Sequence, residues 1–476
     1  MEDRGPSRFN HAERFHCIGS ACEDTCCQGW KVPVDREAFE RFQGLPDGPL
    51  RALIHASVER VPQPADGTRP ASFAVIRMAE GNRCPMLAED RLCRIQNEHG
   101  AGLLPHTCAT YPRIVRTLDG DMETALTLSC PEAARLVLLN KNLLDKNLLR
   151  EPAARPDASL ATGEKDCAPS PIRSPIPSPI RSPIPSWKSA VRDTILRLAV
   201  NRNYPLSQRL FLVGILSRRL DGLASEVDSA GEPGSGARAI LAGFISAVDS
   251  GALRGALCGA MDALPTDGLT QLDALLRLAG LMLHKSNVGP RFAACAHAFT
   301  TGIGNGPDAT LESLARHYAA AYRQCFLPFF NAHPHILENL LVNSILCLNF
   351  PFAVDRDPSK PSKSMARQFA ILAAQFALVR GLLIGVAGYH REQFSADHVV
   401  HTVQSASKHF EHHPDFGNQV EALLAECGLN DARGLTILLD EPAGGRSAQG
   451  IAAEMETPMQ KAERNLNPEA AAARPN

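Results

Sequence analysis

Two consecutive copies of the octapeptide S-P-I-R-S-P-I-P, at 170–177 and 178–185, constrain the fold of this chain more than any other feature. Proline lacks a backbone N–H and has a fixed φ angle, so a segment with proline at this density cannot enter a helix or a sheet. We interpret residues 151–187 as an extended linker of polyproline-II type, and a ligand for a proline-recognition domain is the alternative. The chain is therefore expected to fold as two parts.

The part that follows the linker has the sequence pattern of helices. Its apolar residues recur at intervals of three and four residues, as in "LSQRLFLVGILSRRL" and "LTQLDALLRLAGLMLHK". This period is typical of amphipathic helices, and strand-like alternation is almost absent. Residues 188–440 are predicted to form an all-α domain. Residues 441–476 contain too few large apolar side chains to pack and are predicted to be a disordered tail.

One predicted helix, "FAILAAQFALVRGLLIGVAGYH" at 369–390, is long and apolar enough to raise the question of a membrane span. Gln375, Arg380 and its glycines argue against a span, so we expect a central core helix and no membrane partner. The glycine-rich segment "GIGNG", Gly302–Gly306, follows a stretch of helical composition rather than a strand, and it is predicted to be a loop. The expected fold is mainly α, without a Rossmann sheet.

Eight of the fourteen cysteines lie in the first 130 residues, four of them in "CIGSACEDTCC". The N-terminus has no apolar signal segment, so we expect a cytoplasmic protein, in which clustered cysteines more often bind metal than form disulfides. Thiolates suit zinc or an iron–sulfur cluster, and the spacing does not choose between them. Reduced structural thiols are the alternative. Residues 1–150 are predicted to be an irregular, cysteine-rich, metal- or cluster-binding module.

Several segments in both halves resemble one family. The stretches "CEDTCCQGWKVPVD", "CPMLAEDRLCRIQNEHG", "TCATYPRIV", "LENLLVNSILCLNFPF" and "SASKHFEHHPDF" resemble the flagellin lysine-N-methylases. The resemblance implies a cytoplasmic enzyme that transfers methyl groups from S-adenosylmethionine to lysine ε-amines of its protein partner, flagellin. It also implies a cysteine-bound iron–sulfur cluster of the 4Fe–4S type, with zinc as the alternative. By position, the implied ligands are drawn from Cys17, Cys22, Cys26, Cys27, Cys84, Cys93 and Cys108.

This reaction needs an uncharged lysine amine in line with the sulfonium methyl group, although the free amine has a pKa of about 10.4. Polar side chains in apolar surroundings could orient such an amine. The candidate catalytic residues are Glu338, Asn339, Asn343, Tyr111 and Tyr389. The alternative for each is a buried side chain with a structural hydrogen bond. The sequence does not identify the residues that bind S-adenosylmethionine.

The sequence leaves other interpretations open. On the predicted helix "DHVVHTVQSASKHFEHH", residues such as His401 and Lys408 are expected to form a solvated polar face, with a histidine metal site as the alternative. The formal net charge of −2 gives no general attraction to nucleic acid, so no nucleic-acid partner is expected. A non-enzymatic zinc- or iron-chelating or metal-delivery protein and an electron-transfer iron–sulfur protein are the competing functions. The long helical half argues against a simple carrier.

Overall fold

The computed structural model describes residues 10–62, 72–118, 121–144, 187–221, 235–251, 267–283, 288–353, 364–411, 413 and 415–442. The predicted linker (151–187) and the predicted tail (441–476) lie almost wholly outside the described residues.

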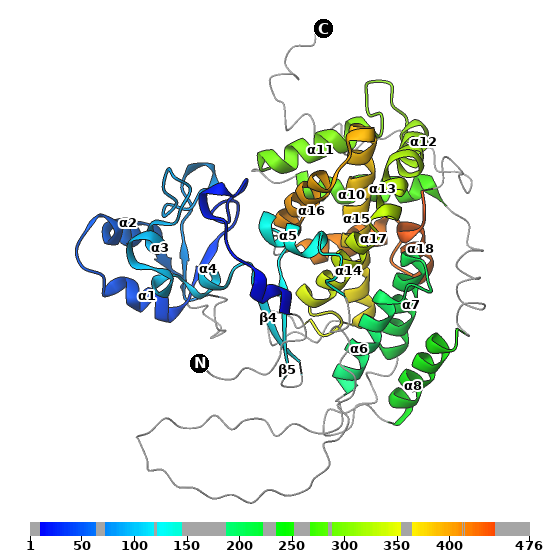
Figure 1. Cartoon of the computed structure of the whole chain (residues 1–476), viewed down its shortest axis with the longest axis horizontal. Helices are drawn as coiled ribbons and strands as arrows, with labels where there is room; N and C mark the ends of the chain where they lie inside the picture. Colours follow the sequence, from blue (N-terminus) through cyan, green and yellow to red (C-terminus); the bar gives the residue numbers. More distant parts are fainter. Residues whose placement is uncertain are drawn as a thin grey trace, which may run out of the picture.

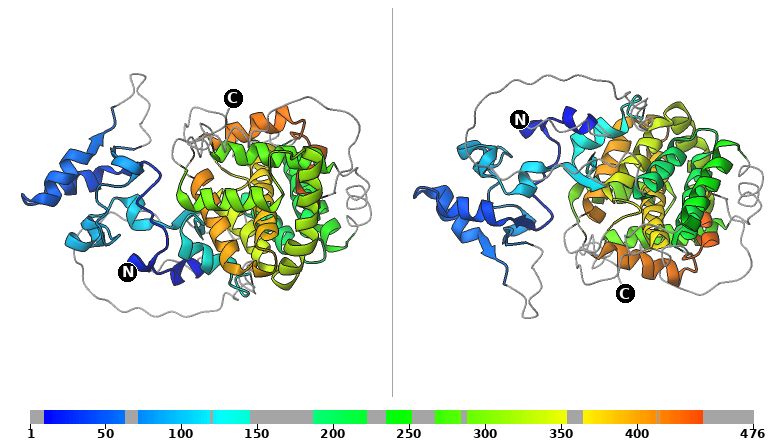
Figure 2. Two further views of the ribbon diagram at one scale, coloured as in Figure 1. Left: turned by 90° about the horizontal axis from the view of Figure 1, so that it is seen from above. Right: turned by 90° about the horizontal axis from the view of Figure 1, so that it is seen from below.

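A small N-terminal body surrounds its own hydrophobic core, which includes Val34, Phe42, Ile54, Ile76 and Met86. Its three-stranded antiparallel sheet has the order β1-β3-β2. The body lies to one side of the helices in all three views (Figures 1 and 2). Its elements are η2 (Gly19–Ala21), β1 (Val32–Val34), α1 (Arg36–Gln43), α2 (Pro49–Ser57), β2 (Val58–Arg60), β3 (Ala74–Ile76), η3 (Glu80–Asn82), α3 (Arg94–His99), η4 (Ala101–Leu103) and α4 (His106–Thr110).

Asp35 links two elements of this small body. One oxygen of its carboxylate accepts a hydrogen bond of 2.8 Å from the backbone N–H of Ala38 and so caps the N-terminus of α1. The other oxygen accepts a hydrogen bond of 2.7 Å from the N–H of His106 at the start of α4. These bonds hold α4 beside β1 and α1, although α4 lies far from both of them in the sequence.

The chain then leaves the small body and joins the helical one. The antiparallel hairpin β4 (Arg113–Leu118) and β5 (Asp121–Leu126) leads to α5 (Pro131–Leu138), which begins at Pro131, because proline is well suited to the first turn of a helix. Leu126, Cys130 and Val137 belong to the large hydrophobic core of the helical body, as do Ala12 and Phe15 near η1 (Asn10–Arg14). The structure thus divides the predicted module, 1–150, between two hydrophobic cores.

The helical body is arranged around the helix α15 (Met365–His390). The most apolar part of this helix is 89% buried inside the structure. This helix is long and apolar enough to cross a membrane, but the structure places it in the core, as predicted (Figure 1). The body's elements are α6 (Trp187–Val200), α7 (Leu206–Asp221), α8 (Ser235–Asp249), α10 (Gly268–Leu283), α11 (Pro290–Gly302), α12 (Leu311–Ala321), the π-helical turn η6 (Tyr322–Phe326), α13 (Leu327–Ala332), α14 (His335–Cys347), α15 (Met365–His390), η7 (Arg391–Gln393), α16 (Ala396–Glu411), α17 (Phe416–Glu426) and α18 (Ala432–Leu439).

Glycines allow α11 and α15 to cross at very short range. A Cβ atom on Gly385 would lie 2.7 Å from the carbonyl oxygen of Phe299, and one on Gly388 would lie 2.7 Å from that of Gly302. Larger side chains at these positions would force the two helices apart. Gly302 ends α11, and Gly304 follows in a turn with φ of 77°, so the predicted loop at "GIGNG" is confirmed.

The predicted fold class is also confirmed. The described residues are mainly helical, and their strands form only the three-stranded sheet and the β4–β5 hairpin, both antiparallel. A Rossmann fold requires a parallel sheet with crossover helices, and the described part of the chain contains none.

Candidate functional site

Five predicted ligands gather on one side of the N-terminal core: Cys26, Cys27, Cys84, Cys93 and Cys108. Cys26 and Cys27 lie in the loop before β1, Cys84 follows η3, Cys93 is the N-cap residue of α3, and Cys108 lies in α4. The sulfur atoms of Cys26 and Cys27 are 3.9 Å apart, and the N–H of Cys84 donates a hydrogen bond of 2.8 Å to the carbonyl of Cys27. Cys27, Cys93 and Cys108 pack against the core that contains Cys84. Four separate positions along the chain therefore bring five thiols together.

These thiols influence one another's protonation. Burial, followed by the nearby Cys93 and Cys26, raises the pKa of Cys108 to about 12. The hydrogen bond with Cys26 lowers the pKa of Cys27, but the hydrogen bond with Cys84 and burial outweigh it and raise the value to about 12. Only Cys84 has its pKa lowered within this group, chiefly by its hydrogen bond with Cys27. Crowded, partly buried thiols resist the loss of several protons unless a cation balances the charge.

The five thiols fit a thiolate-bound metal by the kind and number of their donors. Structural zinc takes about four such ligands, and so does a 4Fe–4S cluster. Among the residues that the structure describes, no group of three or more cysteine, histidine or acidic side chains is already arranged around a metal position. Binding an ion or cluster would require the thiols to turn toward a common point.

The two remaining predicted ligands form a second group with a cysteine that the prediction left out. Cys17 and Cys22 are close enough for charge on Cys17 to raise the pKa of Cys22, after burial as the main cause. The buried Cys130 is close to both Cys22 and Cys26. The exposed sulfur of Cys17 accepts a hydrogen bond of 3.4 Å from the N–H of Gly19. Proximity therefore adds Cys130 to the candidate ligands.

Tyr111, a predicted catalytic residue, begins a chain of hydrogen bonds beside the thiols. Its hydroxyl lies 3.2 Å from that of Ser129, which lies 2.8 Å from that of Thr127. The hydroxyl of Thr127 donates to the carboxylate of Glu411 at the end of α16. Burial raises the pKa of Tyr111 above its usual range and that of Glu411 to about 7. The sequence prediction missed Glu411, although it lies within the quoted stretch "SASKHFEHHPDF".

Glu338, a second candidate, is held between two arginines at the start of α14. Its carboxylate accepts a hydrogen bond of 2.8 Å from Nη1 of Arg209 and bonds of 3.0 Å and 2.7 Å from Nε and Nη2 of Arg202. Burial acts to raise the pKa of Glu338, but these hydrogen bonds and charges lower it below its usual range. Glu338 is thus ionised and fully engaged in ion pairs.

Asn339 and Asn343 fasten the segment β5–α5 to α14. The amide nitrogen of Asn339 donates to the carbonyls of Val137 and Asn140, at 2.9 Å each, and so satisfies the C-terminal end of α5. The amide nitrogen of Asn343 donates to the carbonyl of Leu126 in β5, at 2.9 Å. The hydrogen bonds that the structure shows are therefore structural, while a catalytic role for either residue stays a prediction.

Tyr389, the last candidate, lies near the C-terminal end of α15. Its side chain is 44% exposed, and its ring packs edge-on against the rings of His297 and His390. The structure thus brings only Tyr111 close to the cysteine group. The catalytic role of Tyr389 also stays a prediction.

The expectation that α16 presents a solvated polar face is wrong. Gln404 is fully buried, Ser405 is buried, and His409 packs against the ring of Phe292. This face is covered by α5, α11 and the loop Cys22–Cys27. In this loop, Asp24 forms an ion pair with Lys408. The partners lie hundreds of residues away in the sequence, so helical periodicity alone could not identify them.

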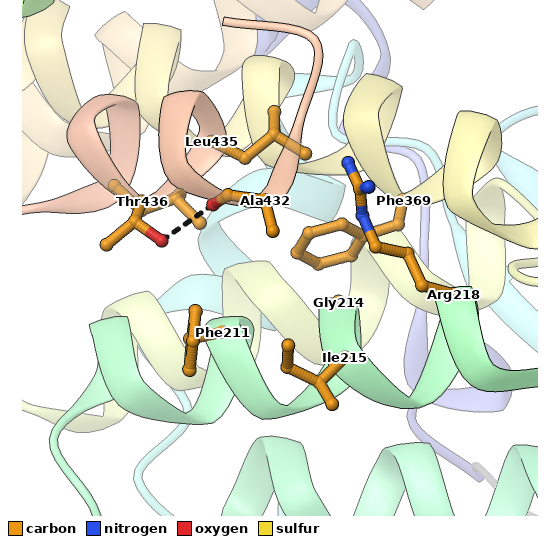
Figure 3. Close-up of a pocket in the computed structure, with 9 residues that line it drawn as sticks. Phe211, Gly214, Ile215, Arg218, Phe369, Ala432, Leu435 and Thr436 are labelled. Carbon is orange, nitrogen blue, oxygen red and sulfur yellow. Dashed lines mark hydrogen bonds between the residues drawn. The ribbon is translucent and has the colours of Figure 1, made fainter. Parts of the chain in front are cut away.

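A small pocket between α7 and α18 is poorly suited to a polar ligand. Figure 3 shows the ring of Phe369 pointing into it beside Gly214, with mostly apolar side chains around them. Of its polar side chains, Thr436 already donates a hydrogen bond of 2.8 Å to the carbonyl of Ala432. We therefore do not assign the methyl-donor site to this pocket.

Comparison with known proteins gives two kinds of match. The family model described as the FliB lysine N-methylase C-terminal domain matches residues 192–438. A lysine-N-methylase of Salmonella typhimurium is 35% identical over 127 residues, which are 26% of this chain and 30% of that protein. The flagellar biosynthetic protein FliU of Salmonella muenchen is 35% identical over 126 residues, which are 26% of this chain and 71% of that protein. No solved structure matches the chain significantly.

Proposed function

Since the chain belongs to the FliB lysine N-methylase family, we propose that it transfers methyl groups from S-adenosylmethionine to lysine ε-amines of flagellin in the cytoplasm. The observation that carries this proposal is the family match over 192–438, which covers most of the helical body. Flagellin is the proposed substrate because a relative is named for flagellar biosynthesis. The matched segment spans about 30% of the Salmonella lysine-N-methylase.

We propose that the five gathered thiols hold an iron–sulfur cluster, with ligands chosen from Cys26, Cys27, Cys84, Cys93 and Cys108. The cluster would supply a redox-active iron centre within the protein. One observation supports the assignment: segments that are far apart in the sequence converge to bring the thiols together. Zinc is the alternative occupant, since it accepts the same donors.

The protein must also accept a proton from the substrate lysine, because only the neutral amine is nucleophilic. Glu411 is the group near the thiols that suits this task best. Its pKa of about 7 lies near neutrality, where a general base works most efficiently. Thr127 and Ser129 connect it by hydrogen bonds to Tyr111, which would orient polar groups on the thiol side of the network.

The test uses full-length protein purified without oxygen and reconstituted with iron and sulfide. It is incubated with labelled S-adenosylmethionine and unmethylated flagellin, and labelled lysines are mapped by mass spectrometry. We expect methyl-lysine to form only when both protein and donor are present. Iron-loaded protein that leaves flagellin unmodified would contradict the proposal and favour a metal-delivery or electron-transfer protein.

A further inference from the structure

We propose that Lys408 of the helical body is a positioning residue that holds the cysteine loop, Cys22–Cys27, in place for the thiol centre. The proposal rests on the proposed function only in taking Cys26 and Cys27 as ligands of that centre. The loop contains bends and turns but no helix or strand. Its conformation must therefore be fixed largely by contacts with other parts of the chain.

Lys408 supplies three such contacts at once. Its ammonium nitrogen lies 2.9 Å from each carboxylate oxygen of Asp24 and 2.8 Å from the carbonyl oxygen of Thr25. An ammonium group has three N–H donors, so all three have an acceptor on this one loop. The side chains of Lys408 and Asp24 are only 19% and 16% exposed, so water screens this pair less than an ion pair on the surface.

The contact with Thr25 is the most informative of the three. The carbonyl that receives the hydrogen bond belongs to the peptide group that joins Thr25 to Cys26. A bond to this oxygen fixes the plane of that peptide and so the direction in which the Cys26 side chain leaves the backbone. An ion pair that served only overall stability would need no bond to this particular carbonyl.

A second residue of α16 supports the same loop. Gln404 lies one helical turn before Lys408, so the two side chains share a face of the helix. Its amide nitrogen donates a hydrogen bond of 2.7 Å to Asp24 and one of 3.0 Å to the carbonyl of Ser129. Its amide oxygen accepts a hydrogen bond of 2.9 Å from Nε of Arg291. Because Gln404 is fixed from several sides, it holds Asp24 in position for Lys408.

The chain just after the cysteine loop also passes close to the lysine side chain. Gly29 has φ of 96°, a conformation that glycine adopts without strain, and a Cβ atom there would lie 3.8 Å from Cε of Lys408. Lys408 lies within the matched family segment, 192–438, whereas the cysteine loop lies outside it. The C-terminal domain thus takes a direct part in forming the N-terminal centre.

The test measures how well the loop is held, using metal-free, reduced, full-length protein. Alkylation of Cys26 and Cys27 by iodoacetamide is followed by peptide mass spectrometry, with Cys427 as the internal reference. We expect Lys408→Met to accelerate alkylation of Cys27, which is half-buried, by about tenfold or more and to leave the reference unchanged, because the loop opens locally. The matched control, Lys188→Met, removes an exposed lysine of α6 and should leave every rate unchanged.

Conservative and compensating variants separate positioning from general stability. Lys408→Arg should protect the loop thiols better than Lys408→Met, since it keeps the charge and donors. The exchange of charges in Asp24→Lys with Lys408→Asp should restore part of the protection that either single change removes. Asp24→Asn keeps the size of the carboxylate and decides the question if Lys408→Met does not fold.

Two results would overturn the proposal. One is alkylation within about twofold of the wild-type rate in both Lys408→Met and Asp24→Asn. The other is an equal acceleration at Cys427, which would show general destabilisation. After reconstitution, the visible absorbance of the cluster should fall in Lys408→Met and persist in Lys408→Arg. Wild-type protein that takes up no iron would refute the proposed cluster, while the alkylation rates would still decide the role of Lys408.

Discussion

Replacing Glu338 by glutamine separates a structural role of this candidate catalytic residue from a chemical one. The side chains of Glu338 and Arg209 are only 5% and 7% exposed, so the variant would leave the buried charge of Arg209 without its carboxylate. Removing one partner of a buried ion pair costs about 3–5 kcal/mol. Arg209 also donates to two backbone carbonyls, which continue to stabilise its charge. We therefore expect a loss of about 3 kcal/mol in the free energy of unfolding.

The measurement is equilibrium urea unfolding followed by circular dichroism. Arg202→Gln is the matched control, because the side chain of Arg202 is 63% exposed and a pair with such a residue contributes about 0–1 kcal/mol. Glu338→Gln protein that remains folded at low temperature should methylate flagellin at nearly the wild-type rate per folded molecule. Wild-type stability combined with lost methylation would refute this reasoning and support the predicted catalytic role of Glu338.

Three further predictions address the thiols, Glu411 and the helix crossing. Cys108→Ser should lower the iron content of anaerobically purified protein and Cys427→Ser should not, as elemental analysis would show; equal iron in both would exclude Cys108 as a ligand. Because the pKa of Glu411 is raised to about 7, its protonation stabilises the folded chain fully below about pH 4.5, and this contribution is lost as the pH rises through 7. Glu411→Gln should therefore show a smaller fall in Tm between about pH 5 and about pH 8 by calorimetry, and an unchanged fall would contradict the raised pKa. Gly385→Ala should lower the free energy of unfolding by about 1–3 kcal/mol through overpacking, whereas Gly243→Ala, on an exposed part of α8, should raise it by about 0.5–1 kcal/mol in the same urea assay. A tolerated Gly385→Ala would refute the close approach of the two helices.

Local sequence patterns were sufficient to predict the elements whose cause is local. The three- and four-residue spacing of apolar side chains predicted the helices after Trp187, and Pro131 marked the start of α5. The long apolar composition of α15, interrupted by Gln375, Arg380 and glycines, predicted a core helix, which the structure confirms. Each of these features follows from the period of a helix or the geometry of proline, so a short window of sequence carries the information.

The sequence also identified the cysteines that gather in the N-terminal body, but it could not sort them. Cys17 and Cys22 belong to the same short motif as Cys26, yet it is Cys84, Cys93 and Cys108 that accompany Cys26 and Cys27. The grouping depends on contacts between separate segments, such as the hydrogen bond that Asp35 accepts from the backbone N–H of His106 at the start of α4. Such contacts leave no periodic trace in the sequence.

The hydrogen-bond and ion-pair partners of the polar side chains were decided by the tertiary structure alone. Residues on α14 and α16 were recognised as polar groups on helices, but their partners lie far away in the chain: Arg209 for Glu338, Leu126 for Asn343 and Asp24 for Lys408. A buried polar atom needs a partner wherever the fold can supply one, and the free energy depends on that partner's position rather than on its separation in sequence. Sequence therefore determined which groups required partners, and packing of the two bodies determined which partners they received.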